Sequence, residues 1–90
     1  MGKQSLPEPN PDAVFKRLDD EAVVVHLGTN RIFTLSQTGA RFWELLAAGK
    51  PRLDIESELC HEFDVTEAQL SAEIDSLVQA LVAEDLLRWT

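Results

Sequence analysis

The chain changes its hydrophobic period inside residues 31–48, which read RIFTLSQTGARFWELLAA. Over the first five of these residues, successive side chains alternate between two faces, as in a β-strand. From Gln37 onward, the apolar residues recur at the spacing of one helix face. Ser36 stands at the change, and its hydroxyl is typical of a helix N-cap. The sequence therefore predicts β-structure before Ser36 and helices after it.

Two further strand signals precede this stretch. Val14–Leu18 is a short candidate strand, and Ala22–Leu27 is rich in valine and has the strongest β-character in the chain. The polar run Asp19–Glu21 separates the two, and Gly28–Asn30 separates the second from the strand at Arg31–Leu35. Short turns between three strands predict an antiparallel meander, with the last strand at an edge unless the C-terminal segment covers it.

Three helices are predicted after this meander. The first spans Gln37–Ala48 and stops at Gly49, a residue type common just after a helix. The second spans Asp54–Phe63. The third begins at Thr66, which forms a capping-box pattern with Gln69. The predicted fold class is therefore α+β: a winged helix-turn-helix-like domain in which an N-terminal three-stranded antiparallel sheet is followed by three helices.

The N-terminal segment has a different composition from the rest. Residues 1–12 contain three prolines and almost no apolar side chains, so we predict a flexible N-terminal arm, followed by one folded domain at residues 13–90. The segment does not resemble a signal peptide, and no apolar run is long enough to cross a membrane. Cys60 is the only cysteine, so no disulfide forms within the chain. These features together predict a cytoplasmic protein.

Charge argues against nucleic acid and membranes as partners. The 90 residues include 16 Asp and Glu but only 8 Lys and Arg, which gives a formal net charge of −8. Phosphate backbones and anionic lipid surfaces repel such a domain. A winged helix that binds DNA also needs a basic recognition helix, and the third predicted helix contains no Lys or Arg. DNA binding is therefore the less favoured alternative.

The chain also lacks a recognisable catalytic pattern. Cys60 and His61 are adjacent, so on a helix their side chains diverge by about 100° and make a poor nucleophile–base pair. His26 lies on a predicted strand, where we expect it on a half-exposed face. One cysteine and two histidines offer no zinc-ligand spacing, and neither a phosphate loop nor a catalytic triad is present. The sequence therefore predicts no enzyme activity, no cofactor and no metal site.

In order and spacing, these motifs resemble those of the PqqD-like family over residues Val14–Leu87. The pattern Arg-x-Phe-x-Leu occurs at Arg31–Leu35, followed by Ser/Asn-x-x-Gly-x-x-Φ-Trp-x-Leu-Leu at Ser36–Leu46. An acidic-aromatic-Asp run ends the second helix at Glu62–Asp64, and Leu-x-x-x-x-Leu-Leu closes the pattern at Leu81–Leu87. Many relatives have Asn where this chain has Ser at the start of the second pattern, and either residue can cap a helix.

The resemblance implies a non-catalytic binding protein of the RiPP recognition element class. Such domains act as peptide chaperones: they hold the leader segment of a ribosomally synthesised precursor peptide and deliver it to a modifying enzyme or a leader peptidase. The leader would add as an antiparallel strand beside the third strand, next to the third helix. Two pathway types remain open, lasso-peptide maturation and a radical-enzyme pathway such as pyrroloquinoline quinone biosynthesis.

Carried onto this chain, the resemblance implies a site made of the third strand and one face of the third helix. The predicted peptide-binding residues are Arg31, Ile32, Phe33, Thr34 and Leu35 on the strand and Glu67, Leu70, Ile74, Asp75, Leu77, Val78 and Leu81 on the helix. Apolar members would hold apolar leader side chains, while Glu67 and Asp75 would attract a Lys or Arg of the leader. The alternative for Ile74, Leu77 and Leu81 is a place in the core, and the alternative for Asp75 is a solvated helix face. The strand has neither Lys nor Pro to block pairing, so its edge is expected to be open. A general protein–protein adaptor that uses the same edge is the alternative.

Overall fold

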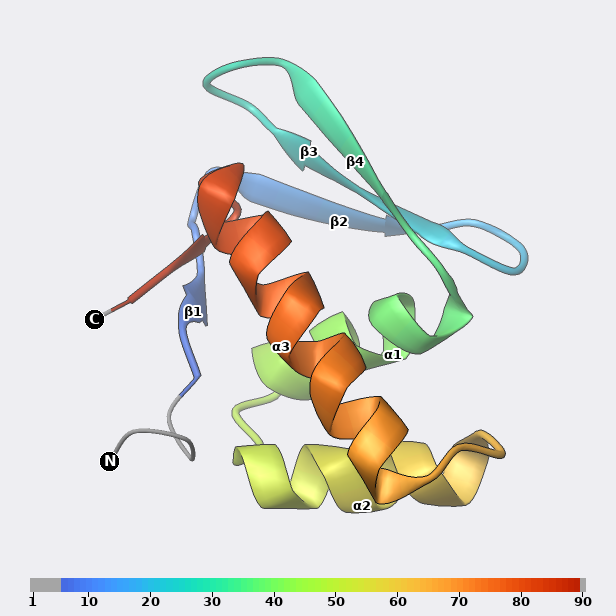
Figure 1. Ribbon diagram of the computed structural model, residues 1–90. Helices are drawn as coiled ribbons and strands as arrows, with labels where there is room; N and C mark the ends of the chain where they lie inside the picture. Colours follow the sequence, from blue (N-terminus) through green and yellow to red (C-terminus); the bar gives the residue numbers. More distant parts are fainter. Residues whose placement is uncertain (1–5, 90) are drawn as a thin grey trace.

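The computed structural model describes residues 6–89 and contains two small sheets and three helices (Figure 1). The elements in chain order are β1 (Glu8–Pro9), β2 (Ala13–Arg17), β3 (Ala22–His26), β4 (Arg31–Leu35), α1 (Gln37–Ala47), α2 (Arg52–Glu62), α3 (Glu67–Ala83) and β5 (Leu87–Arg88). The predicted order of a three-stranded antiparallel sheet followed by three helices is confirmed. No helix among residues 6–89 has the length and apolar character needed to cross a membrane.

The main sheet has the strand order β2-β3-β4, with β3 in the centre. Val24 of β3 lies between Phe15 of β2 and Phe33 of β4, and both pairings are antiparallel. The β3 residues alternate between buried and half-buried, so one face of the sheet packs on the core and the other faces outward. β4 has the bounds predicted from the sequence, and the other two strands differ from prediction by one residue.

Local signals set the helix ends. The Gly39 amide donates to the Ser36 hydroxyl at 3.3 Å, which is the N-cap predicted for α1. Thr66 and Gln69 form the predicted capping box at α3. α2 begins at Arg52, two residues earlier than predicted, because Pro51 occupies its N-cap position in an extended conformation. Proline is compatible with the start of a helix, since its missing N–H would have no helical partner there.

The core lies between the sheet and the three helices. Phe42 and Trp43 of α1 are almost fully buried, as predicted, and the Trp43 ring stacks on Phe15 of β2 with a centroid separation of 6.3 Å. α3 contributes a stripe of buried residues at a spacing of three or four: Leu70, Ile74, Val78 and Leu81. α1 packs against both the sheet and α2, and α2 in turn packs against α3.

The N-terminal segment differs from the flexible arm expected from its composition. Among its described residues, β1 pairs antiparallel with β5, with Glu8 opposite Arg88 and Pro9 opposite Leu87. Pro7 is buried, and residues 1–5 of the expected arm lie outside the described residues. Prolines favour an extended backbone, so this segment can pair over two residues without the alternating apolar pattern that predicts most strands.

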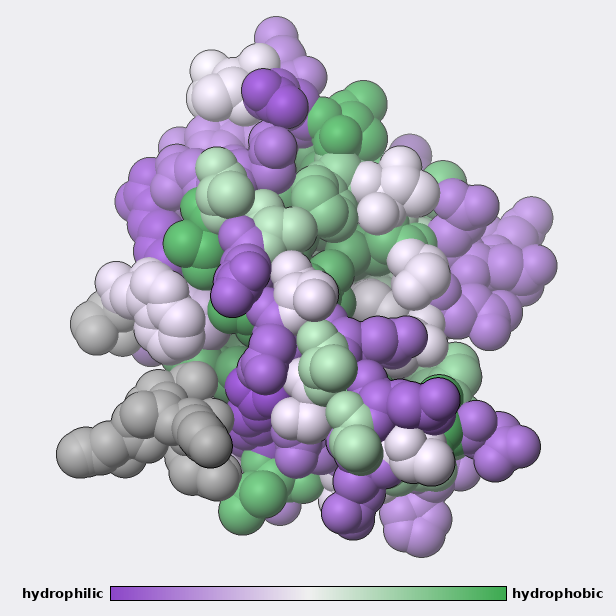
Figure 2. Space-filling model, viewed as in Figure 1, coloured by the Kyte–Doolittle hydropathy of each residue, from purple (hydrophilic) through white to green (hydrophobic). Residues whose placement is uncertain are grey.

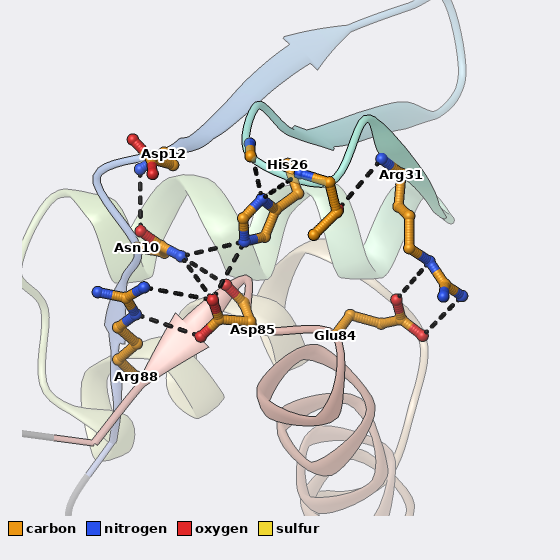
Figure 3. A network of polar contacts seen from close by, with 9 residues as sticks. Asn10, Asp12, His26, Arg31, Glu84, Asp85 and Arg88 are labelled. Carbon is orange, nitrogen blue, oxygen red and sulfur yellow. Dashed lines mark hydrogen bonds and ion pairs between the residues drawn. The ribbon is translucent and has the colours of Figure 1, made fainter.

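His26 is buried, with 6% of its surface exposed, rather than half-exposed as its strand position suggested. Its Nδ1 accepts the backbone N–H groups of Gly28 at 3.0 Å and Thr29 at 3.3 Å (Figure 3). That role fixes the ring proton on Nε2, which donates to Oδ2 of Asp85 at 3.1 Å. Asn10 completes the network by donating its side-chain amide to the Asp85 carbonyl at 2.7 Å. The network joins the N-terminal segment, the sheet and the end of α3.

Asp85 holds an unusual backbone conformation at the end of α3, with φ of 59°. The Leu86 N–H donates to the Leu81 carbonyl and the Asp85 N–H to the Val82 carbonyl, each at 2.9 Å. These two bonds make a Schellman ending, in which glycine is the usual residue at the position of Asp85. The hydrogen bonds of the Asp85 carboxylate offset the conformational cost of a residue with a Cβ there.

We expect the contribution of Asp85 to stability to be lost only in strong acid. Hydrogen bonds from Arg88 and then His26 lower the pKa of Asp85 from 3.8 to about 2. Because this pKa is depressed in the folded state, the stabilisation is complete above the unfolded value and falls as the pH drops from about 4 to about 2. Urea unfolding of the wild type and of Asp85→Asn should therefore differ by a constant amount above pH 4 and converge toward pH 2. A difference that disappears already near pH 5 would contradict the assignment.

Candidate functional site

A groove of about 900 Å³ lies between the end of β4, the start of α1 and one face of α3. Its lining residues are Thr34, Leu35, Ser36, Thr38, Gly39, Phe42, Leu59, Val65, Gln69, Leu70, Ala72, Glu73, Ile74, Ser76 and Leu77. Figure 2 shows apolar side chains gathered on the molecular face between β4 and α3, with polar side chains around them. The groove is therefore mainly apolar at its floor and open along its length.

One wall of the groove is a strand edge without a partner strand. β4 pairs only with β3 among the described residues, so its other side carries free backbone groups. The pairing geometry identifies them. Leu27, the residue after β3, donates its N–H to the Asp12 carbonyl, just before β2, at 2.9 Å. Hydrogen-bonded residues of an antiparallel pair recur at every second position, so the odd-numbered residues of β3 bond to β2 and the even-numbered ones bond to β4. The N–H and C=O groups of Ile32 and Thr34 therefore point away from β3, toward the open edge.

α3 forms the opposite wall through a face next to its buried stripe. The groove-facing residues there are Gln69, Ala72, Glu73, Ser76 and Leu77. They recur at spacings of three and four, so they share one side of the helix. Ala72 and Ser76 are small, which leaves open space where longer side chains would fill the gap between α3 and β4.

The structure brings five of the twelve predicted site residues into the groove lining. They are Thr34, Leu35, Leu70, Ile74 and Leu77. Of these, Leu70 and Ile74 are buried and form its floor, while Leu77 is half-buried. Val78 and Leu81 belong to the same apolar arc of α3, but they pack in the core and do not line the groove.

The two predicted acidic residues lie elsewhere on α3. Asp75 accepts a hydrogen bond from Arg52 of α2, with 2.7 Å between its Oδ1 and the arginine Nη2. Glu67 borders a separate hollow over α2, together with Leu53 and Cys60. Helical periodicity explains this result, because both residues are off the face that carries Glu73 and Leu77. Neither carboxylate is positioned to meet a ligand in the groove.

The first three residues of β4 have different roles. Arg31 forms an ion pair with Glu84, with 3.1 Å between its Nε and Oε1 of the glutamate, and so links β4 to the C-terminal end of α3. Phe33 is half-buried against the core. Ile32 is 67% exposed on the outer face of the sheet, so its side chain points away from the groove. Only its backbone N–H and C=O groups face the open edge.

Sequence reasoning missed ten lining residues, which lie at the start of α1 and within it, in α2, in the loop before α3 and on α3. The missed lining residues are Ser36, Thr38, Gly39, Phe42, Leu59, Val65, Gln69, Ala72, Glu73 and Ser76. A usable signal was present in α3, where Ala72 and Ser76 are small residues one turn apart beside an apolar stripe. Gly39 was a second signal, because a glycine inside a helix often marks a close approach of another element. In the structure, a Cβ at this position would lie 3.3 Å from Leu35 Cδ2 and 3.6 Å from Leu77 Cδ2.

The groove lining is mostly uncharged. Glu73 is the one ionisable side chain among the described residues of its lining, and no histidine or cysteine borders it. Cys60 and His61 lie together at the hollow over α2, away from the groove. Within residues 6–89, no three His, Cys, Asp or Glu side chains lie close enough together to hold a metal ion. The open strand edge and the apolar floor are the features that can recognise a ligand.

Comparison with known proteins places this fold in a family. Residues 21–87 match the family described as coenzyme PQQ synthesis protein D (PqqD). A solved structure described as TbiB1 in complex with the TbiA(beta) leader peptide superimposes on the chain with a TM-score of 0.81 and 31% sequence identity. The match covers 89% of this chain and 93% of that chain. No curated protein matches the sequence. The family match includes β3, β4 and all three helices, and the chain therefore belongs to the PqqD family.

Proposed function

We propose that the chain binds the leader segment of a ribosomally synthesised precursor peptide without carrying out chemistry on it. The leader adds as an antiparallel strand to the free edge of β4, and its side chains enter the groove beside α3. The observation that carries this proposal is the open edge of β4 directly beside an apolar groove. The similarity to a protein solved with a leader peptide supports the same ligand class.

The free energy of binding divides between the edge and the groove. The N–H and C=O groups of Ile32 and Thr34 offer up to four backbone hydrogen bonds, which contribute about 2–6 kcal/mol at about 0.5–1.5 kcal/mol each. Micromolar affinity requires about 8 kcal/mol after the costs of association. One or two apolar leader side chains in the groove, at about 1.5–3 kcal/mol each, supply much of the remainder and the sequence specificity.

The bound leader brings the precursor to a second protein. Tethering raises the effective concentration of the precursor at a modifying enzyme or a leader peptidase, which supplies the chemistry. Lasso-peptide maturation and pyrroloquinoline quinone biosynthesis both remain compatible pathways. The cytoplasmic location and the identity of the partner enzyme remain predictions from the sequence.

A fluorescence-polarisation titration tests the proposal directly. The probe is the labelled leader of a short precursor peptide encoded beside this protein, and the controls are a scrambled peptide of the same composition and a DNA duplex. We expect saturable binding of the leader at micromolar concentration or below, and no binding of either control. Equal binding of the scrambled peptide, or no binding of the leader, would overturn leader recognition and favour the adaptor alternative.

A further inference from the structure

Glu73 differs from the other side chains of the groove because it is charged. The rest of the described lining is apolar or uncharged polar, and it contains no Lys, Arg or Asp. Glu73 is also exposed, so its carboxylate is available to a molecule in the groove. A single carboxylate above an apolar floor is a feature that can select one charge in a ligand.

Several acidic residues of α2 and α3 already have basic partners, whereas Glu73 has none among residues 6–89. Asp75 pairs with Arg52, and Glu84 pairs with Arg31. Glu56 also pairs with Arg52, at 2.9 Å. Few Lys or Arg side chains are available to pair with Glu73, since the formal net charge of the chain is −8. This net charge also attracts a basic peptide over a long range.

Contacts along α3 and β4 fix where Glu73 lies relative to a guest strand. The Arg31–Glu84 pair joins the start of β4 to the end of α3. Leu77, earlier on α3, lies close to Gly39, next to Leu35 at the end of β4. The two elements therefore run in opposite directions. Glu73 is one turn further along α3, about 6 Å beyond Leu77 and past the end of β4.

This placement gives the position of the complementary residue in the guest. A strand antiparallel to β4 passes Leu35 first, and its residue opposite Leu35 points to the same face of the sheet, into the groove. A separation of about 6 Å equals about two residues of a strand. The guest residue nearest Glu73 is therefore two positions before the one opposite Leu35.

We infer that the leader carries a Lys or Arg two positions N-terminal to the apolar residue that meets Leu35, and that Glu73 selects it. The inference rests on the proposed leader binding and names the ligand class of the same groove: a basic, partly apolar segment. The contribution of Glu73 is to specificity, since an uncharged leader keeps its backbone bonds to β4 and loses one charge-assisted contact.

The test is a double-mutant cycle read by fluorescence polarisation. Glu73→Gln is expected to bind the natural leader about twofold to fivefold more weakly than wild type, the size expected for one exposed ion pair. A leader with alanine at the basic position should bind both proteins equally. Glu67→Gln is the matched control: it removes the same charge from an exposed position of α3 outside the groove, and it should bind as wild type does.

A charge reversal and a position scan make the test specific. Glu73→Lys should prefer a leader with Glu at the basic position over the natural leader. When lysine is placed at each position in turn of a leader whose basic residue has been replaced by alanine, affinity should rise at the position nearest Glu73, and Glu73→Gln should lose that gain. If wild type binds the leader but Glu73→Gln binds it equally well, the inference is overturned and leader binding stands. If wild type binds no leader, the proposed function fails instead.

Discussion

Thr34→Pro is expected to weaken leader binding by about tenfold to a hundredfold while the protein stays folded. The Thr34 N–H points to the open edge of β4, so proline removes a donor that the guest strand needs and none that β3 needs. Proline is tolerated in edge strands where its nitrogen faces solvent. The proline ring also occupies the space that an incoming carbonyl oxygen would take.

Arg17→Pro is the matched control for this prediction. Arg17 ends β2, and by the same alternation its N–H points outward at the opposite edge of the sheet. Its ion pair with Glu44 is exposed and long, at 3.5 Å, so its loss has little effect on stability. Fluorescence polarisation with the labelled leader should show the loss for Thr34→Pro only, with circular dichroism confirming that both variants are folded. Wild-type affinity in a folded Thr34→Pro would show that the leader does not add to β4.

Trp43→Ala should cost about 3–5 kcal/mol of unfolding free energy. Trp43 is 3% exposed and stacks on Phe15, so its removal leaves a cavity where α1 meets the sheet. A domain of this size has a total stability of about 5–15 kcal/mol, and the variant is therefore expected to be partly or largely unfolded at 37 °C. Urea unfolding followed by circular dichroism measures the loss.

Trp89→Ala provides the comparison for the same residue type on the surface. Trp89 is 58% exposed, and its replacement should change the unfolding free energy by less than about 0.5 kcal/mol. Each variant keeps one tryptophan, so its fluorescence reports on that residue alone. The emission spectrum should shift on unfolding in Trp89→Ala, which keeps Trp43. A loss of stability for Trp89→Ala as large as for Trp43→Ala would contradict the packing described above.

The main features of the fold follow from local signals. The change of period at Ser36, the capping box at Thr66 and the valine-rich run of β3 each depend on residues a few positions apart. These signals were sufficient to predict the sheet, the helices and the free edge at β4. Hydrophobic periodicity indicates which face of a strand or helix a residue occupies, and it can be read directly from the sequence.

The remaining features depend on residues that are distant in the chain. His26 lies 16 positions from Asn10 and 59 from Asp85, so no local pattern could predict that the three residues form one network. The pairing of β1 with β5 has the same cause. The choice of groove face on α3 also depends on packing: the apolar stripe identifies the side that is buried, whereas Glu73 and Ser76 belong to the adjacent side.

The antiparallel pairing of β1 with β5 places the two described ends of the chain side by side, with Glu8 opposite Arg88 (Figure 1). The groove is built mainly from β4, α1 and α3, so neither Glu8 nor Arg88 at the described ends is part of it. An enzyme or a fluorescent label fused at either end would extend from the same corner of the molecule and leave the edge of β4 accessible. The two ends are also close enough for a short loop to join them, which makes the domain a natural candidate for circular permutation.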